Sequence, residues 1–285
     1  MSFKQALKNN LPAPLFHFLR DVPSKAKGLF ETKPSGQGPI PPLHLMFDGP
    51  RSYEHFINMG NETLEFYKTA VGVKPADSIL DIGCGIGRKT IPLLDYLNPE
   101  ALYVGLDIDR RGIDWLLRNV TSENRRFVFL HLDIYNKFYN PKGALLSSRL
   151  VLPFPDASFD IVALWSVFTH MFPRDIAHYL SEISRVLKPG GRVVASYYLL
   201  NDEILALMQD SKTDVNFAYQ LENCRTTNPN MPEDALAVND AWLRRVYEDL
   251  RLQPEQFLYG GWSKHTPYPG TDTINLQDIV IAQKK

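Results

Sequence analysis

A turn with three alternating glycines, at residues 83–87, most constrains the fold of this 285-residue chain. The turn follows a short apolar run around one acid, Asp81, which is typical of a buried strand. A helical pattern comes after it, made by Ile86, Thr90, Leu93, Leu94 and Leu97. Glycine accepts positive φ and lets backbone approach a ligand closely, and exposed N–H groups at a helix start favour negative charge. The unit therefore predicts a ligand cradle.

The glycine spacing selects among ligands. A dinucleotide fingerprint G-x-G-x-x-G requires a third glycine where this chain has Arg88. The glycines here are Gly83, Gly85 and Gly87, and the acid stands two residues before the first. This order resembles motif I of the class I S-adenosylmethionine-dependent methyltransferases. The resemblance implies that the three glycines lie beside the methionine and ribose parts of S-adenosylmethionine, Asp81 near its amino group and Arg88 near its carboxylate.

A second strand is predicted over residues 102–107, and it ends in an acid twenty residues beyond Gly87. At this station of nucleotide-binding α/β folds a carboxylate accepts hydrogen bonds from ribose hydroxyls. Asp107 and Asp109 compete for the role. The segment around Asp107 and Ile108 resembles the family's post-I segment, so we prefer Asp107 and place Ile108 with it. Asp109 is then the N-cap of the next helix.

The third strand is predicted over residues 127–133. By resemblance, Asp133 and Ile134 occupy the place where the family holds the adenine. His131 alternates to the same side as Asp133, and a structural histidine is the simpler interpretation. The aromatic loop at 135–149 is either an ordinary surface loop or a lining of the substrate site.

Residues 152–160 read L-P-F-P-D-x-S-F-D and precede an apolar strand at 159–164, a pattern that resembles motif II/III of small-molecule methyltransferases. The resemblance places Trp165, at the end of this strand, with the cofactor. His170 follows, where doubly wound folds hold their ligands. One imidazole takes up a proton near neutral pH, so His170 is the candidate catalytic base. A structural side chain that closes the loop is the alternative.

The remaining pattern completes an α/β domain. A helix begins with Pro173 as its first residue and is expected to end at a cap glycine within 188–191, before a fifth strand at 192–198. A helix containing Leu243 and closing strands at 252–259 and 274–281 follow. The predicted fold is a three-layer α/β sandwich with a seven-stranded, mostly parallel sheet whose last strand is antiparallel. Residues 199–238, where the pattern weakens, are where the family inserts a substrate cap.

The first 50 residues are predicted to be an extension with eight prolines, which is basic by four charges up to Lys33. It either packs on the surface of the methyltransferase-like domain at 51–285 or gives residues 1–33 a peripheral membrane or partner contact through a basic amphipathic helix. The helical segment 51–73 resembles the helix that covers the cofactor in this family. We expect it to act as a lid.

Composition narrows the class of protein. The net charge of −1 gives no general reason to expect nucleic acid, and the chain lacks the N/D-P-P-Y/F tetrapeptide of amino-methylating nucleic-acid enzymes. Two cysteines without metal spacing predict neither a disulfide framework nor a metal site, and they favour a reducing compartment. No apolar run is long enough to span a membrane, and no signal peptide is evident, so a cytoplasmic protein is expected.

Together these patterns predict transfer of a methyl group from S-adenosylmethionine to a small-molecule, sugar or lipid-linked acceptor, with O-methylation favoured. A catalytically inactive scaffold that binds S-adenosylmethionine is one alternative. A nicotinamide-dependent oxidoreductase is the other, and the register of the glycines argues against it.

Overall fold

A computed structural model describes residues 32–34, 38–46, 50, 52–137, 139–264 and 276–285. The described α-helices are α3 (Tyr53–Phe66), α4 (Leu93–Tyr96), α5 (Arg110–Leu116), α6 (Pro173–Val186), α7 (Asp202–Gln209) and α8 (Asp240–Asp249). The described strands are β1 (Ile79–Ile82), β2 (Tyr103–Asp107), β3 (Phe127–His131), β4 (Phe159–Leu164), β5 (Leu187–Tyr197), β6 (Leu199–Leu200), β7 (Tyr219–Leu221), β8 (Cys224–Thr226), β9 (Leu236–Asn239), β10 (Leu252–Leu258) and β11 (Asp278–Lys284). None of these helices is long and apolar enough to cross a membrane.

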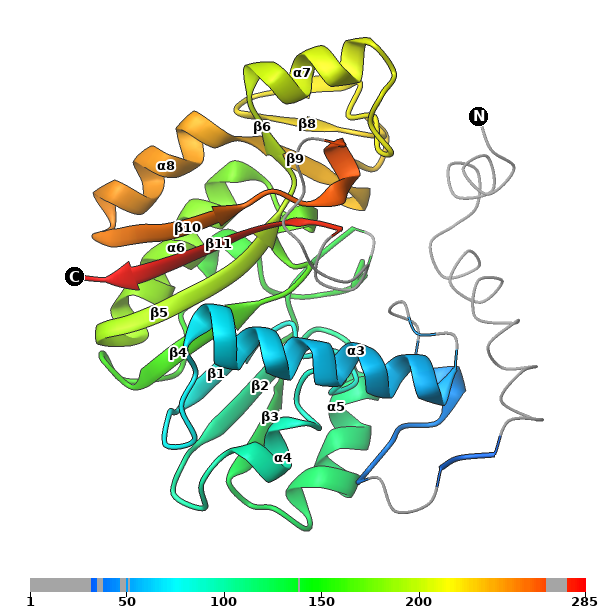
Figure 1. Cartoon of the computed structure of the whole chain (residues 1–285), viewed down its shortest axis with the longest axis vertical. Coiled ribbons are helices and arrows are strands. Elements are labelled where there is room, and N and C mark those ends of the chain that lie inside the picture. Colours follow the sequence, from blue (N-terminus) through cyan, green and yellow to red (C-terminus); the bar gives the residue numbers. More distant parts are fainter. Residues whose placement is uncertain (1–31, 35–37, 47–49, 51, 138, 265–275) are drawn as a thin grey trace.

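Seven strands form the main sheet, in the order β10-β11-β5-β4-β1-β2-β3. β1 pairs in parallel with β2 and β4, and β2–β3 and β4–β5 are also parallel. β11 runs antiparallel to both of its neighbours, β5 and β10. The predicted sheet of six parallel strands and an antiparallel last strand is confirmed (Figure 1).

Helices cover both faces of this sheet, which explains the nearly continuous apolar runs of its strands. Leu80 and Ile82 of β1 pack into one core cluster with residues of α6 and α8. Ile79 joins a second cluster with residues from the end of α3 and from α5. The sheet is therefore the middle of three layers, as predicted.

The helix directly after the glycine turn is shorter than the sequence predicts. Residues 86–92 form successive hydrogen-bonded turns, in which Thr90 and Ile91 donate to the Gly87 carbonyl, and α4 is only four residues long. Pro92 has no N–H and so cannot donate into a regular helix here. α3 also passes close to this segment: a Cβ on Gly60 would lie only 2.7 Å from the Arg88 carbonyl oxygen.

The junction between α6 and β5 also differs from the prediction. α6 does begin with Pro173 as its first residue, but it ends without a glycine cap because Leu187 is already extended. β5 starts at Leu187, opposite Phe159, and its register with β4 shifts before Ile161 pairs with Arg192. Gly190, at φ +80°, lies inside this irregular start of the strand.

The closing strand was placed a few residues too early. Residues 274 and 275 lie outside the described residues, and β11 starts at the buried Asp278. It continues to Lys284, which pairs with Leu252 of β10. Hydrogen bonding along β10 therefore extends β11 past the last large apolar side chain, Ile281.

Residues 199–239 build a second sheet, in the order β6-β9-β8-β7. Figure 1 shows it with α7 at the top of the molecule, beside α8. Leu199, Leu236 and Val238 belong to the same core cluster as residues of β5 and β11, so the two sheets share a core. The segment that was expected to be a substrate cap thus has a small fold of its own on the main domain.

Residues 40–46, from the end of the predicted extension, also pack on the domain. Ile40, Leu43 and Met46 form a third cluster with residues of α3 and with Ile86 of the glycine turn. Residues 1–31, with most of the predicted basic segment, lie outside the described residues.

Candidate functional site

The glycine turn lies at the carboxyl end of β1. Gly83, Gly85 and Gly87 have φ of +85°, +58° and +83°, which is the left-handed region. A Cβ on Gly83 would lie 2.3 Å from Val167 Cγ2, and one on Gly87 would lie 2.6 Å from Leu116 Cδ2. The first and third glycines therefore also let β4's following loop and α5 pack tightly around the turn.

Asp107 stands at the end of β2, beside this turn. Its Oδ2 accepts a hydrogen bond of 2.6 Å from the Gly85 N–H, and its Oδ1 accepts one of 2.7 Å from the Asp109 N–H. Asp109 itself accepts from the Arg111 N–H at 3.1 Å, so its predicted N-cap role is confirmed. The carboxylate of Asp107 is thereby fixed at the mouth of the glycine turn.

Asp81 is buried, with 2% of its surface exposed. Its Oδ2 accepts from the Tyr103 hydroxyl at 2.6 Å, and that hydroxyl is also 2.7 Å from Thr90 Oγ1. Oδ1 is buried without a hydrogen-bond partner among the described residues. Burial raises the pKa of Asp81, an effect that the nearby Lys89 charge opposes.

An unsatisfied buried acceptor is costly. Asp81 Oδ1 therefore fits a donor from a ligand, such as the amino group of the cofactor implied by the sequence. Tyr103 was not singled out in the sequence. It lies two residues before Gly105 and four before Asp107, and the alternation of a strand would have placed all three on one face.

The residues after β3 divide into exposed and buried groups. Asp133 is exposed and accepts from Asn140 Nδ2 at 3.3 Å and from the Ala144 N–H at 3.4 Å. Ile134 is buried in the core cluster that contains residues of α6, and the half-buried Ile108 packs against the same cluster. His131 places Nε2 3.2 Å from the Ile108 carbonyl oxygen, which agrees with a structural histidine.

Trp165 and Arg88 both contact the segment that was expected to be a lid. The Trp165 indole N–H donates to the Tyr67 hydroxyl at 2.8 Å, and its ring lies edge-on to Phe66 at 5.7 Å. Arg88 donates from Nη1 to Met59 Sδ at 3.4 Å. Both side chains therefore link the strand ends to α3, and their contact with a cofactor remains a prediction.

His170 lies in the 3-10 helix Phe168–His170, after β4. Its Nδ1 is 2.8 Å from the Glu233 carbonyl oxygen, and its Nε2 is 3.2 Å from the Tyr139 hydroxyl. A carbonyl only accepts, so Nδ1 carries a hydrogen. In the neutral imidazole Nε2 is then the acceptor, and Tyr139 donates to it. The imidazole thus connects the loop after β3 to residues 232–234 of the insertion. Its catalytic role stays a prediction.

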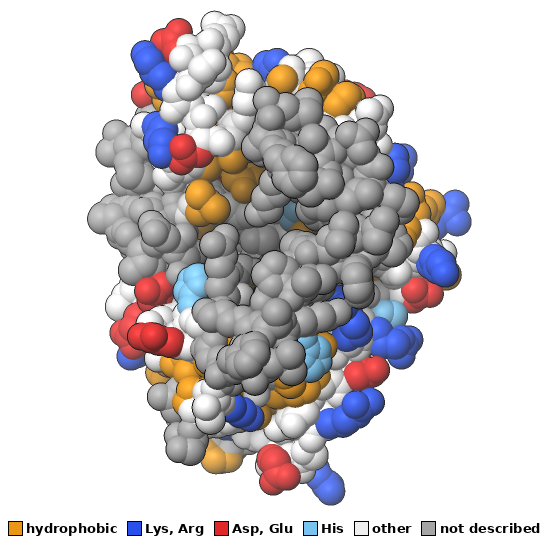
Figure 2. Space-filling view, turned by 90° about the vertical axis from the view of Figure 1, so that its right-hand side faces the viewer, with side chains coloured by type: hydrophobic (Ala, Val, Ile, Leu, Met, Phe, Trp, Pro, Cys, Tyr) orange, Lys and Arg blue, Asp and Glu red, His pale blue; other side chains and the backbone are white. Residues whose placement is uncertain are grey.

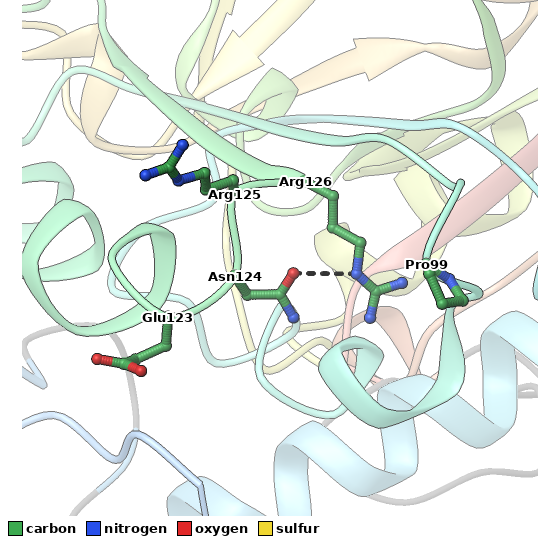
Figure 3. A pocket seen from close by; sticks show the side chains of 5 residues that line it. All are labelled: Pro99, Glu123, Asn124, Arg125 and Arg126. Carbon is green, nitrogen blue, oxygen red and sulfur yellow. Dashed lines mark hydrogen bonds between the residues drawn. The ribbon is translucent and has the colours of Figure 1, made fainter.

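The hollow shown in Figure 3 is not at this site. It is an open surface hollow of about 420 Å³, lined by Pro99, Glu123, Asn124, Arg125 and Arg126. These residues precede β2 and β3, at the opposite end of the parallel strands. Arg126 donates from Nε to Asn124 Oδ1 at 3.1 Å and from Nη2 to the Leu94 carbonyl at 2.7 Å, so it joins the segment before β3 to α4.

The described residues contain no group of three or more histidine, cysteine or acidic side chains that could hold a metal ion. Cys84 and Cys224 are both free and buried. Burial raises the pKa of the Cys84 thiol well above its ordinary value, so this thiol, inside the glycine turn, is kept protonated.

Comparisons with known proteins identify methyltransferases as similar proteins. A family model described as "Methyltransferase domain" matches residues 80–195. The tRNA N(3)-cytidine methyltransferase METTL2 of Gallus gallus is 30% identical over 134 residues, which is 46% of this chain and 33% of that protein. The ubiquinone/menaquinone biosynthesis C-methyltransferase UbiE of Vibrio campbellii is 27% identical over 216 residues, 74% of this chain and 71% of that protein.

The match thus spans only a third of the chicken protein, and 40% of an uncharacterized methyltransferase of Schizosaccharomyces pombe. Among solved structures, the PH0226 protein of Pyrococcus horikoshii has a TM-score of 0.53 at 16% identity, over 81% of this chain and 92% of that one. This likeness shows the shared fold.

Proposed function

We propose that this chain is a class I S-adenosylmethionine-dependent methyltransferase, which the methyltransferase-domain match at residues 80–195 supports, and that it methylates a hydroxyl-bearing acceptor at the carboxyl ends of β1, β2 and β4. The carrying observation is the glycine turn, together with the orphaned Asp81 Oδ1 and the Asp107 carboxylate that accepts from the Gly85 N–H of the turn. When bound, S-adenosylmethionine supplies an electrophilic methyl group on a sulfonium ion.

The chain's own residues would hold this cofactor by its polar groups. Asp107 would accept from the ribose hydroxyls, and Asp81 Oδ1 would accept from the amino group. Asp133 and Ile134 would contact the adenine, and Arg88 the carboxylate. The binding energy of these groups serves chiefly to align the methyl group with the acceptor.

We further propose that His170 acts on the acceptor through Tyr139. The Tyr139 hydroxyl donates to His170 Nε2, so its oxygen is oriented to accept a proton from an acceptor hydroxyl. When an acceptor hydroxyl is methylated, its proton would pass to the Tyr139 oxygen while the tyrosine proton passes to His170 Nε2. The resulting imidazolium would keep its Nδ1–H on the Glu233 carbonyl.

The acceptor class is proposed to be a small molecule, a sugar or a lipid-linked compound. The Vibrio campbellii relative, which is aligned over 216 residues, is named for ubiquinone and menaquinone biosynthesis, which supports a ring-bearing, lipid-linked acceptor. The chicken relative is named for tRNA, so tRNA belongs in the same screen.

The first test is thermal protection by S-adenosylhomocysteine. A ligand at about a hundred times its dissociation constant stabilises the folded state by about 2.7 kcal/mol. Asp107→Ala should abolish the shift in melting temperature. The matched control is Asp109→Ala, which loses an N-cap worth about 1 kcal/mol but should keep the shift. Protection by NADH in place of S-adenosylhomocysteine would contradict the proposal.

The second test is a methyl-transfer screen over phenols, quinols, sugars, lipids and tRNA. With a hydroxyl acceptor, Tyr139→Phe should lower kcat by about 10²–10⁴, the usual contribution of general base catalysis, and leave the thermal shift intact. Unchanged kcat in this variant would remove Tyr139, and with it the proton relay to His170, from the mechanism. Protection without turnover on any acceptor would favour the inactive scaffold.

A further inference from the structure

The segment between β3 and β4, residues 135–151 (the β3–β4 loop), exposes an unusual amount of apolar surface. It contains five of the nine large hydrophobic side chains that are exposed in the described part of the chain: Tyr135, Tyr139, Leu145, Leu146 and Val151. The exposed fraction is 51% for Leu145, 49% for Leu146 and 71% for Val151. Single exposed hydrophobic residues are ordinary, whereas a cluster marks an interaction surface.

The same loop is positively charged. Lys137, Lys142 and Arg149 are its only ionised side chains by sequence, because no acid occurs between Asp133 and Asp156. Lys142 and Arg149 are exposed, and Lys137 donates to the Asn230 carbonyl at 2.7 Å. The whole chain carries a net charge of −1, so this excess of positive charge is local.

The described residues of the loop, 135–137 and 139–151, have a defined backbone. Ile134 and Leu145 form an isolated bridge, in which the Tyr135 N–H donates to the Leu145 carbonyl at 2.7 Å. A 3-10 helix, Ser147–Arg149, separates the two leucines from Val151. Hydrogen bonds therefore fix the backbone that carries these exposed side chains, and the side chains themselves point outward without packing against the core.

The loop also borders the proposed active site. It begins at the carboxyl end of β3, and Tyr139 contacts His170 with ring centres 4.9 Å apart. β11 runs to the left in Figure 1, so the parallel strands end toward the right, and Figure 2 views that side.

We propose that the β3–β4 loop docks on an anionic membrane surface, with Leu145, Leu146 and Val151 in the lipid interface and Lys142 and Arg149 at the headgroups. Apolar side chains flanked by cations bind such surfaces by burial and by charge attraction together. This docking proposal rests on the proposed methyl transfer. In the docked orientation, the active site faces an acceptor that is carried in the membrane. An RNA could bind the cations through its phosphates and stack its bases on the tyrosines. It would, however, leave the three most exposed aliphatic side chains in contact with water.

The test is co-sedimentation of the full chain with vesicles of phosphatidylcholine alone or mixed with phosphatidylglycerol. We expect binding to the mixed vesicles. Replacing Lys142 and Arg149 by Gln should weaken it roughly fivefold for each cation removed. The double variant Leu145→Ser/Leu146→Ser should weaken it about tenfold or more, because two leucines leave the interface.

Matched controls remove similar groups elsewhere. Leu117→Ser takes away a leucine that is 40% exposed beyond α5, and Lys212→Gln removes an exposed cation of the insertion. Both should bind vesicles like the unchanged chain. Each variant is also tested for protection by S-adenosylhomocysteine, which should persist and shows that the protein is folded.

Equal vesicle binding by the Leu145→Ser/Leu146→Ser variant, or no binding to mixed vesicles at all, would overturn the docking proposal. Binding of a folded RNA that depends on Lys142 and Arg149, without vesicle binding, would overturn it in favour of an RNA surface. If the chain binds vesicles but shows no protection by S-adenosylhomocysteine, the proposed function is contradicted and the docking proposal still stands.

Discussion

Gly83 and Gly190 require glycine for different reasons: backbone conformation at both positions, and lack of space for a Cβ at Gly83 alone. Both have left-handed φ, +85° and +80°. A Cβ on Gly83 would lie 2.3 Å from Val167 Cγ2, whereas nothing lies within 4 Å of one on Gly190. We expect Gly190→Ala to cost about 1 kcal/mol through backbone strain. Gly83→Ala should cost about 2–4 kcal/mol, because overpacking is added to that strain.

Urea denaturation of the two variants measures this difference in the free energy of unfolding. Similar losses for both would mean that Val167 moves aside at little cost, and that the tight packing of the loop after β4 on the glycine turn contributes little to stability.

Single residues with local partners could be predicted from the sequence. Asp109 is the N-cap of α5 and accepts from the N–H two residues further along the chain. Asp107 ends an apolar strand at the expected distance from the glycines. The partners of His170 could not be predicted. They stand 31 and 63 residues away, at Tyr139 and Glu233, and only the meeting of three loops at one sheet edge brings them together.

At the scale of elements, apolar runs between turn residues located the strands well. β1 and β4 have the predicted positions because Gly and Asp-Ala-Ser turns bound them on one side. Element ends were less predictable where a tertiary contact decides them. Pro92 and the close approach of α3 at Gly60 shorten the helix after the glycine turn, and the pairing with Phe159 makes Leu187 part of β5.

At the scale of the whole molecule, the main sheet followed from the order of strands and helices, since parallel strands need crossover connections. The second sheet was not predicted. Its strands are two to four residues long, which is too short for a periodic signal. They are held by the shared core, in which Leu199 and Val238 pack with residues of β5 and β11.

Asp278 is a polar link between the two sheets. It opens β11 and accepts from the Leu199 N–H at 2.7 Å, at the start of β6, and from the Gly260 N–H at 2.7 Å. The Trp262 indole N–H donates to it at 2.9 Å. Burial raises the pKa of Asp278 to about 7, although these donors favour the charged form.

This raised pKa gives the link a pH dependence with a definite sign. The unfolded carboxyl titrates near its ordinary value of about 4, so between about pH 4 and pH 7 the folded chain binds more protons than the unfolded one. The contribution of Asp278 to stability therefore falls as the pH rises through this window. It reaches its lowest value above pH 7, where the buried group is charged in the folded state.

Urea denaturation between pH 5 and pH 8 of the unchanged chain and of Asp278→Asn measures the effect. The amide cannot accept all three hydrogen bonds, so the variant is less stable in itself, and the informative quantity is how the difference between the two proteins changes with pH. We expect that difference to shrink by about 1–3 kcal/mol from the acid to the alkaline end, since one pKa unit corresponds to about 1.4 kcal/mol. The exposed Asp249→Asn variant controls for the loss of one negative charge. Parallel curves for the unchanged chain and Asp278→Asn would mean that the three donors hold the carboxylate ionised throughout, and that the two sheets are joined by a permanent charge.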